Sequence, residues 1–450
     1  MAGERKSWHF GVMSFTGTGH VNSLILLAQH LKDRGHRVTF FEKPKIERRV
    51  RDAGLEFFSI GAGRPSRKQN ETQHTNSRLG TQLSTIQFNL KRIKEDLGTY
   101  LQETPGALKQ RGVDALLVNE IALTGPTVAE LAGLPHIIIS TSVPHHFGWN
   151  DLPWLSGYKY SASSLSWLET NLFEVSALRM RGPIQRALDH YRREAGLGRA
   201  RTTRKLFPEL AHITQLPQCL DSPRSQLAAN FHYTGPWANQ AARPHVDFPW
   251  DKLDGRPVVY ASLGTTRNVQ GFIFRLIAEA CQGLDLQLVI SLGGRFDPDG
   301  FPDLPGNPLV TRYVPQLELL KLATMVITHG GPNTVFEALM QGKPMVAIPL
   351  AHDQPAVAAR LARLGIAEVL PVMRLSAEKI QSAVSTVLND PSYRSAAEAM
   401  QTELQSLHGL ERAADLIEEA LEKNSTGRAN GSASELDRGI NVSAAMSPTL

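Results

Sequence analysis

The sequence predicts an α/β protein made of two doubly wound, Rossmann-like domains that face each other across a cleft. Its length of 450 residues is too great for one ordinary core. Apolar strand-like runs alternate with helical segments in both halves. Between the halves, residues 238–257 are rich in Pro, Ala and Asp and show no periodicity. In such folds ligands bind at the carboxyl ends of the strands, so we expect functional residues at the cleft.

The elements of the first domain, placed at 1–237, follow from short apolar runs. Strands are predicted at His9–Met13, Arg37–Phe41, Leu55–Ile60, Ala115–Val118 and His136–Ser140. The turn Thr16–Gly19 opens a helix at Val21–Arg34. The alternation of these elements is typical of a parallel sheet with covered faces.

The second domain, placed at 258–408, follows the linker at 238–257 and repeats the pattern. Strand-like runs are found at Val258–Leu263, Gln287–Ser291, Leu309–Tyr313, Met325–Ile327 and Met345–Pro349. A helix at 409–423 closes the fold. Residues 424–450 are small and polar, and we expect them to be disordered.

Composition narrows the class of protein. With 42% hydrophobic and 20% charged residues, the chain has the composition of a globular protein. Cys219 and Cys281 lack metal-ligand spacing, so a reduced cytoplasm is expected rather than a disulfide framework. We find no apolar run typical of a signal peptide or membrane span. The net charge of +5 is modest, and without arginines interleaved with aromatics it does not indicate nucleic-acid binding.

The segment 311–360 carries the strongest functional signal. A strand-like run ends in Thr-His-Gly-Gly-Pro-Asn-Thr, where Gly330 and Gly331 allow close approach of the backbone to a ligand. Asn333 and Thr334 stand at the start of a helix, where unpaired N–H groups and the helix dipole favour an anion. This combination predicts a phosphate site that needs no lysine.

Further polar residues follow in an order that matches the parts of a nucleotide sugar. Glu337, one helical turn on, can accept hydrogen bonds from a ribose diol. Tyr313 can stack on a flat base, and Asp353 and Gln354 can read sugar hydroxyls. Each feature alone is more often a turn, a solvated loop or core, and it is the ordered set that predicts the ligand.

This ordered set resembles the donor signature of the family 1 UDP-sugar-dependent glycosyltransferases, which have the GT-B fold. Within that family the chain is similar to bacterial zeaxanthin glucosyltransferase-like enzymes, from about His9 to Leu421. The resemblance implies a UDP-sugar donor, glucose by analogy at Gln354, inversion of configuration, and no metal or other cofactor. It implies these donor-binding residues: Gly19, Thr265, Ser291, Tyr313, Val314, Gln316, His329, Gly331, Pro332, Asn333, Thr334, Glu337, Asp353 and Gln354.

The resemblance also implies that His20 is the general base. A histidine titrates near neutrality and can take a proton from an acceptor hydroxyl. The usual aspartate partner is replaced by Asn119, followed by Glu120. The Asn119 carbonyl can still accept from the ring and fix its orientation, but it cannot stabilise the charge of an imidazolium. Three explanations stay open: Glu120 takes over, the acceptor hydroxyl is acidic, or the enzyme is slow.

The acceptor is predicted only as a class. An aromatic-rich stretch that includes Phe147, Trp149 and Trp154 is either ordinary helical core or a wall of an apolar acceptor pocket. A xanthophyll, a flavonoid or other phenol, a sterol or a macrolide would fit it. A carotenoid acceptor would also bring peripheral contact with a membrane. We expect a monomer.

Two rival functions remain. Gly17 and Gly19 after the first strand, with Glu42 ending the second, favour a nicotinamide oxidoreductase, although Asn22 replaces the third glycine. Asn119 favours a sugar-nucleotide-binding protein with impaired catalysis. Asp297 and Asp299 have the spacing of a metal motif, but in a Gly/Pro-rich loop we assign them to the surface.

Overall fold

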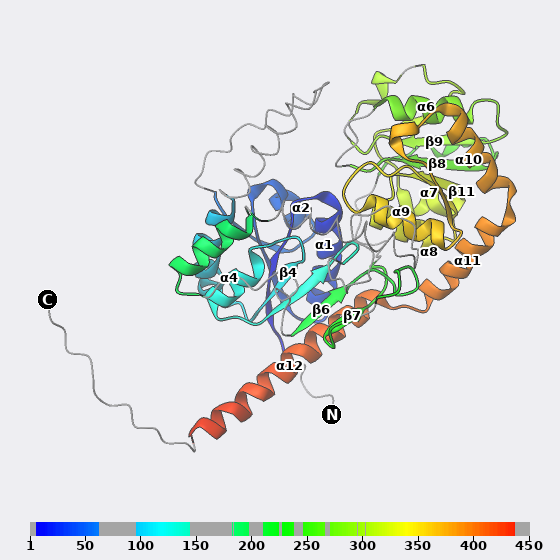
Figure 1. Ribbon diagram of the computed structural model, residues 1–450. Helices are drawn as coiled ribbons and strands as arrows, with labels where there is room; N and C mark the ends of the chain where they lie inside the picture. The colour runs from blue at the N-terminus through cyan, green and yellow to red at the C-terminus, as the bar shows by residue number, and fades with distance from the viewer. Residues whose placement is uncertain are drawn as a thin grey trace.

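The computed structural model describes residues 6–62, 96–144, 182, 184–197, 210–224, 227–237, 246–265, 271–294, 296–301 and 303–436. Two parallel sheets, each flanked by helices, are formed within these ranges (Figure 1). The aromatic residues predicted to contact the acceptor lie outside them: Phe147, Trp149 and Trp154.

The first sheet has seven parallel strands in the order β3-β2-β1-β4-β5-β6-β7. The strands are β1 (His9–Met13), β2 (Arg37–Glu42), β3 (Glu56–Ser59), β4 (Ala115–Asn119), β5 (His136–Ser140), β6 (Ala211–Thr214) and β7 (Phe231–Tyr233). Residues 96–110 and 184–194 are helical, and further helices are α1 (Thr18–Asp33), α2 (Glu47–Asp52) and α4 (Gly125–Ala132). The strand order reverses between β1 and β4, which makes the gap between their carboxyl ends a ligand-binding position.

The second sheet has six parallel strands in the order β10-β9-β8-β11-β12-β13. The strands are β8 (Val258–Ser262), β9 (Gln287–Ser291), β10 (Leu309–Thr311), β11 (Ala323–Thr328), β12 (Met345–Ala347) and β13 (Ala367–Val369). The helices are α6 (Gly271–Cys281), α7 (Gln316–Leu322), α8 (Pro332–Met340), α9 (Gln354–Arg363), α10 (Ala377–Asn389) and α11 (Pro391–Gln405). The order reverses between β8 and β11, as in the first sheet. The predicted pair of doubly wound sheets is confirmed.

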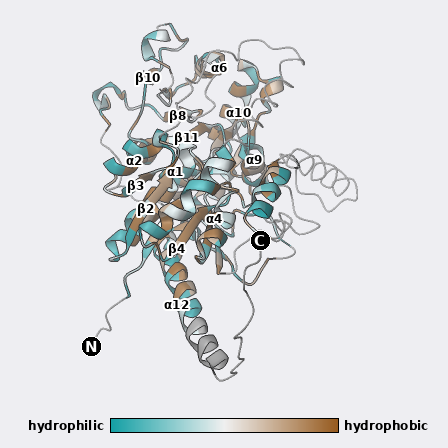
Figure 2. Ribbon diagram, turned by 90° about the vertical axis from the view of Figure 1, so that its left-hand side faces the viewer, coloured by the Kyte–Doolittle hydropathy of each residue, from teal (hydrophilic) through white to brown (hydrophobic). Residues whose placement is uncertain are grey.

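Burial explains why the strands could be read as apolar runs. All five residues of β1, β4 and β8 are buried. Figure 2 shows the strands of the first sheet in brown, with teal confined mainly to helix faces and loops. Strands with helices on both faces lose the polar alternation of a half-exposed sheet. The predicted bounds of β1, β5 and β9 match the structure.

The C-terminal helix α12 (Gly409–Leu436) is longer than predicted. The expectation of a disordered tail was wrong for residues 424–436, and 437–450 lie outside the described ranges. Ser425 Oγ donates to the carbonyl of Leu421 at 2.9 Å, and Thr426 Oγ1 donates to that of Glu422 at 3.1 Å. These hydroxyls are satisfied inside the helix, so small polar residues do not end it.

Helix α12 packs on the first domain. Its residues Ala413, Ile417 and Leu421 join the core formed by α1 and the first sheet, beside which it runs in Figure 1. Arg34 at the end of α1 pairs with Asp415 at 2.6 Å and with Glu418 at 2.9 Å. The last helix therefore returns from the second sheet to the first. Over the described residues, no helix has the length and apolarity to cross a membrane.

A buried ion cluster joins the two domains behind the cleft. Asp221, after β6, accepts from Arg360 of α9 at 2.9 Å and from Arg224 at 2.5 Å. The hydroxyl of Tyr233 donates to the same carboxylate at 2.8 Å. The segment around Leu216 and Asp221 packs against the core of the second sheet, so these contacts fix one domain against the other.

Candidate functional site

The two strand-order reversals face each other across the cleft. His20 lies in the first turn of α1, the helix that follows β1, and Asn119 ends β4. On the second sheet, loops follow β8 and β11. Asn333 Nδ2, at the start of α8, donates to the carbonyl of Gly19 at 3.0 Å, and Ser142 Oγ contacts Asp353 Oδ2. The sequence-predicted residues of both domains are thus brought together.

The glycine loop before α8 has the predicted backbone. Gly330 adopts a φ of 79°, a left-handed value that favours glycine, and Gly331 caps α8. Pro332 is the first helical residue, where its missing N–H costs nothing. The N–H groups of Asn333 and Thr334 belong to the helix start, where α-helical N–H groups lack partners inside the helix. An anion fits there.

The His329 ring lies beneath this loop. A Cβ at Gly331 would come within 2.4 Å of the ring, and one at Gly264 within 2.6 Å, so both glycines are also required by packing. Burial lowers the pKa of His329 to about 4, which keeps the ring neutral at neutral pH. Its Nδ1 is buried and finds no hydrogen-bond partner within the described structure. The ring supports the loop, and the contact of His329 with a sugar-nucleotide donor stays a prediction.

The candidate ribose and base residues form a linked set. Buried Glu337 accepts from Gln316 Nε2 at 2.7 Å, and Gln316 Oε1 accepts from the hydroxyl of Tyr260 at 2.7 Å. The Gln316 side chain therefore holds the carboxylate in place. Tyr313 is 49% exposed beside Gly294, with a ring available for stacking, whereas Val314 is buried in the core.

The candidate sugar-reading residues are held by a tight turn. Gln354 Oε1 accepts from the N–H groups of Leu350 at 2.8 Å and Ala351 at 2.9 Å. Within this turn His352 has a φ of 60°, a strained value for a residue with a Cβ. The turn fixes Asp353 at the start of α9, next to Ser142 of the first domain. These bonds hold the side-chain oxygen of Gln354 against the turn and fix the orientation of its amide.

The remaining predicted donor residues flank the second-sheet reversal. Thr265 is exposed after β8, and Ser291 is buried at the end of β9. A Cβ at Gly293 would come within 2.2 Å of the carbonyl oxygen of Gly264, so the loops after β8 and β9 pack closely. Both residues border the donor side of the cleft.

The catalytic candidates are linked by a residue that the sequence did not indicate. His20 Nδ1 lies 2.6 Å from Thr141 Oγ1, and Asn119 Nδ2 donates to the same oxygen at 3.1 Å. The expectation that the Asn119 carbonyl accepts from His20 was wrong. That carbonyl accepts instead from the backbone N–H of Ile121 at 3.2 Å, which turns the amide nitrogen toward Thr141.

Glu120 does not reach His20. Ser140 Oγ donates to Glu120 Oε2 at 2.6 Å, and His212 Nε2 lies 3.7 Å from Glu120 Oε1. Successive residues at the end of β4 point to opposite sides of the sheet, which separates Glu120 from Asn119. The interpretation in which Glu120 replaces the missing aspartate was therefore wrong.

The His20 ring sits at the cleft, where burial favours its neutral form. Burial lowers its pKa, an effect that nearby Asp353 opposes and His352 reinforces. Phe15 meets the ring edge-on, with centroids 5.7 Å apart, and is itself 47% exposed. Phe15 was missed in the sequence, although an aromatic residue before a glycine turn at the end of a strand was a usable signal.

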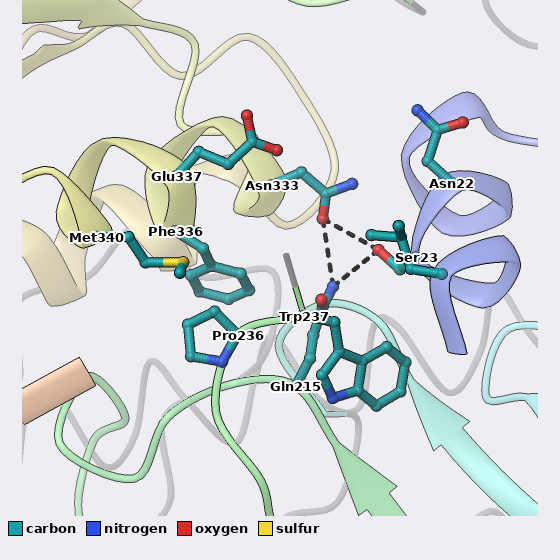
Figure 3. A pocket seen from close by; sticks show the side chains of 10 residues that line it. Asn22, Ser23, Gln215, Pro236, Trp237, Asn333, Phe336, Glu337 and Met340 are labelled. Atoms are coloured by element: carbon teal, nitrogen blue, oxygen red, sulfur yellow. Dashed lines mark hydrogen bonds between the residues drawn. The ribbon is translucent and has the colours of Figure 1, made fainter. Parts of the chain in front are cut away.

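A small cavity marks the seam between the domains. Gln215 Nε2 donates to Ser23 Oγ at 3.1 Å and to Asn333 Oδ1 at 3.2 Å, and Ser23 Oγ donates to the same Asn333 oxygen at 3.2 Å. Figure 3 shows this triangle beside Trp237. The cavity of about 10 Å³ has room for one water at most. The Asn333 side chain thus binds the first domain, leaving its backbone N–H for a phosphate.

A larger hollow, of about 850 Å³, lies away from the cleft. Its lining includes Gln287 and Leu309, the first residues of β9 and β10. The amino ends of parallel strands are opposite the edge where such folds bind ligands. It is therefore not part of the candidate site.

Two motifs from the sequence take structural roles. Asp297 accepts from Arg312 at 2.6 Å and caps a short 3-10 helix at Pro298–Gly300, as expected of a surface loop. The described ranges contain no group of three or more His, Cys, Asp or Glu arranged for a metal. Glu42 is fully buried, so the ribose-binding role required by the oxidoreductase alternative has no exposed carboxylate.

Comparisons with known proteins agree with this geometry. A model of the UDP-glucuronosyl and UDP-glucosyl transferases matches residues 195–416, and a model of the glycosyltransferase family 28 N-terminal domain matches 12–138. The zeaxanthin glucosyltransferase of Pantoea ananas is 28% identical over 418 residues, covering 92% of this chain and 96% of that protein. An NDP-glycosyltransferase of Bacillus subtilis is 25% identical, covering 93% and 99%.

Solved structures share the fold. The glycosyltransferase of kitacinnamycin superposes with a TM-score of 0.72 at 24% identity, covering 92% of this chain and 100% of that one. The calicheamicin glycosyltransferase CalG4 gives 0.71 at 22% identity, covering 93% and 99%. Two parallel-sheet domains that face each other across a cleft are the GT-B fold, which these solved structures share. The family-model matches and the glucosyltransferase relatives identify the chain as a glycosyltransferase enzyme that is similar to the UDP-glucuronosyl and UDP-glucosyl transferases.

Proposed function

We propose that this enzyme transfers glucose from UDP-glucose to a hydroxyl of an apolar small molecule, a carotenoid or a flavonoid or other phenol, with inversion at the anomeric carbon. The observation that carries the proposal is the meeting of His20, Asp353 and the start of α8 across one cleft. Such a transfer needs a group at the acceptor hydroxyl, a group that reads the sugar, and a site for the diphosphate. Similarity to zeaxanthin glucosyltransferases supports the reaction type.

In the proposed step the acceptor oxygen attacks the anomeric carbon from the side opposite UDP. Where the acceptor hydroxyl is still protonated, its proton passes to Nε2 of His20 as the new C–O bond forms, which requires the ring hydrogen to be on Nδ1. The bond from the anomeric carbon to the β-phosphate oxygen breaks, and its electron pair leaves with UDP. The N–H groups of Asn333 and Thr334 and the dipole of α8 would stabilise the charge that develops there. His20 then returns the proton to solvent.

We propose that no metal is required, because a helix start supplies the positive potential that a cation would otherwise give. Glu337 would bind the ribose, Tyr313 the base, and Asp353 with Gln354 the sugar. We also propose that the enzyme is a monomer in the cytoplasm. Its two well-separated free cysteines are consistent with that compartment.

The test is release of UDP from UDP-glucose with zeaxanthin, a flavonol, a simple phenol and a sterol as acceptors, with and without a chelator. Turnover that survives the chelator supports the proposal, and dependence on added metal contradicts that part of it. Replacement of His20 by Ala is expected to lower turnover by about 10²-fold or more while UDP still binds. Exposed His190→Ala, far from the cleft motifs, is the matched control and should keep full activity.

A second candidate is a sugar-nucleotide-binding protein with impaired catalysis. Asn119, in the position of the usual aspartate, favours it because an amide cannot stabilise an imidazolium by charge. UDP binding measured by calorimetry, without UDP release on any acceptor of the panel, would support this candidate over the first.

A further inference from the structure

The proposed proton transfer requires a particular form of His20. Only a neutral ring that carries its hydrogen on Nδ1 can accept a proton at Nε2. Nδ1 faces Thr141 Oγ1 at 2.6 Å, so the hydrogen-bonding state of that hydroxyl decides which nitrogen is protonated.

The orientation of Asn119 is fixed by the backbone. The N–H of Ile121 can only donate, so the atom 3.2 Å from it must be the Asn119 carbonyl oxygen. The amide nitrogen then faces Thr141 Oγ1 at 3.1 Å and donates to it. The reverse orientation of the amide would set two donors against each other at Ile121.

The hydroxyl of Thr141 is left with one hydrogen to place. Thr141 is only 4% exposed, so a hydrogen without an acceptor would be buried and unsatisfied. His20 Nδ1, at 2.6 Å, is the acceptor in place. The backbone carbonyl of Thr141 is meanwhile bound by Gln215 Nε2 at 2.6 Å, which holds the residue against the ring.

Resting on the proposed transfer from UDP-glucose, though not on proton transfer to His20, we infer that the hydrogen bonds from Asn119 through Thr141 hold His20 with its hydrogen on Nε2, and that the acceptor is therefore an acidic, phenolic hydroxyl rather than an aliphatic alcohol. An aspartate at position 119 would accept a hydrogen bond from Thr141, so the direction of donation along Asn119, Thr141 and His20 would be reversed. Asn119 donates, and Nε2 faces the cleft as a hydrogen-bond donor.

The chemistry balances without a strong base. The phenol loses its proton to solvent and binds as a phenolate, whose oxygen accepts from His20 Nε2–H. That oxygen bonds to the anomeric carbon, and the sugar–phosphate bond breaks with its electrons going to UDP. An aliphatic alcohol is not ionised near neutral pH and would require the other tautomer. The titratable groups that face His20 are Asp353 and His352, both from the turn before α9.

The direct test is the nitrogen-15 chemical shift of the two His20 ring nitrogens in the full-length chain, assigned by their loss in His20→Ala. We expect the wild-type ring to carry its hydrogen on Nε2, and the Asn119→Asp ring to carry it on Nδ1. Thr141→Val should abolish the effect of Asn119→Asp, and Thr141→Ser should preserve it. A wild-type ring protonated on Nδ1 would overturn the inference.

Thr104→Val is the matched control for loss of a buried hydroxyl. Thr104 is fully buried, and its Oγ1 has no hydrogen-bond partner within the described structure. This variant should leave the His20 shifts and the kinetics unchanged. If Thr104→Val changes the His20 shifts as Thr141→Val does, the change is a general effect of packing and not of the hydrogen bond between Thr141 and His20.

The kinetic test compares acceptors that differ in acidity, 4-nitrophenol, phenol and benzyl alcohol, with UDP-glucose as donor. We expect kcat/KM for the phenols to rise with pH as the phenol ionises. We expect Asn119→Asp to raise turnover of benzyl alcohol relative to 4-nitrophenol by about tenfold or more. A positioned general base supplies roughly 10²–10⁴-fold, so a gain of this size is within its reach. Equal wild-type turnover of alcohol and phenol, or a ratio that Asn119→Asp leaves unchanged, contradicts the inference. If no acceptor leads to release of UDP from UDP-glucose, the proposed function is contradicted instead. The nitrogen-15 shifts of His20 still test the hydrogen bonds from Asn119 through Thr141.

Discussion

The donor and catalytic sides of the cleft are built in different ways. Most of the donor side comes from one stretch, 311–354, and relies on backbone N–H groups, glycines and a helix start. The catalytic side is assembled from His20, Asn119, Thr141 and Gln215, which lie at or just after the carboxyl ends of four different strands. The donor side can be recognised along the chain, whereas the catalytic side exists only after folding.

The difference has a chemical consequence. A helix start favours an anion whatever most of its side chains are. A chain of side-chain hydrogen bonds depends on the donor or acceptor character of each member, and one change from carboxylate to amide reverses it. We therefore expect the donor side to tolerate single substitutions better than the catalytic side does.

The largest expected effect concerns the seam that both sides share. Arg360→Ala removes the α9 partner of buried Asp221 and leaves that carboxylate with Arg224 and Tyr233. Breaking a buried ion pair by removing one partner costs about 3–5 kcal/mol. Chemical denaturation of the variant should show a loss of this order, with UDP binding and turnover both weakened.

Exposed Arg256→Ala, which breaks a surface pair with Asp254, is the control and should leave stability unchanged. Burial raises the pKa of Asp221, but the guanidinium groups of Arg224 and Arg360 outweigh burial and lower it overall. The stabilisation is therefore present above the unfolded pKa of 3.8 and is lost as pH falls through the lower folded value. Equal stability of wild type and Arg360→Ala at pH 7 would mean that the seam does not hold the domains together.

A second prediction tests the donor side alone. Glu337→Ala should weaken UDP binding by about 1.5–3 kcal/mol, the loss expected for hydrogen bonds to a charged group. Calorimetric titration with UDP measures it, and Glu378→Ala, exposed on α10, is the matched control. The His20 ring shifts should not change in Glu337→Ala. An unchanged UDP affinity would remove Glu337 from the ribose site.

The sequence predicted the parts that depend on local pattern. Buried strands appear as apolar runs, and the Gly-Gly-Pro-Asn run marks the start of α8 because each residue has a local conformational reason to be there. Thr141 offered no such signal. Its role comes from the pairing of β4 with β5, in which Asn119 lies opposite Ile139. Thr141 follows Ile139 by two residues and therefore lies on the same face as Asn119.

The sequence was least informative where a residue type suits several environments. Ser425 and Thr426 looked like a disordered tail but bond to the helix backbone, since hydroxyls can replace water as partners. Glu120 and Asn119 are neighbours in the chain and still belong to different hydrogen-bond networks. Only the sheet geometry separates them.

The last prediction compares a carboxyl of each region. Glu337 on the donor side accepts a hydrogen bond from Gln316, whereas Glu42 on the first sheet is fully buried, accepts from the N–H of Lys43 at 2.9 Å, and leaves Oε2 without a partner within the described structure. Burial raises the pKa of Glu42 to about 8, from 4.5 in the unfolded chain. Between these values the native state holds a proton that the unfolded chain has lost, so stability falls as pH rises, by about 1.4 kcal/mol per pH unit.

Glu42→Gln cannot titrate and should flatten the decline in melting temperature between pH 5 and 8. Parallel pH profiles for the two proteins would mean that Glu42 is ionised in the native state, and the contrast between the two carboxyls would be lost.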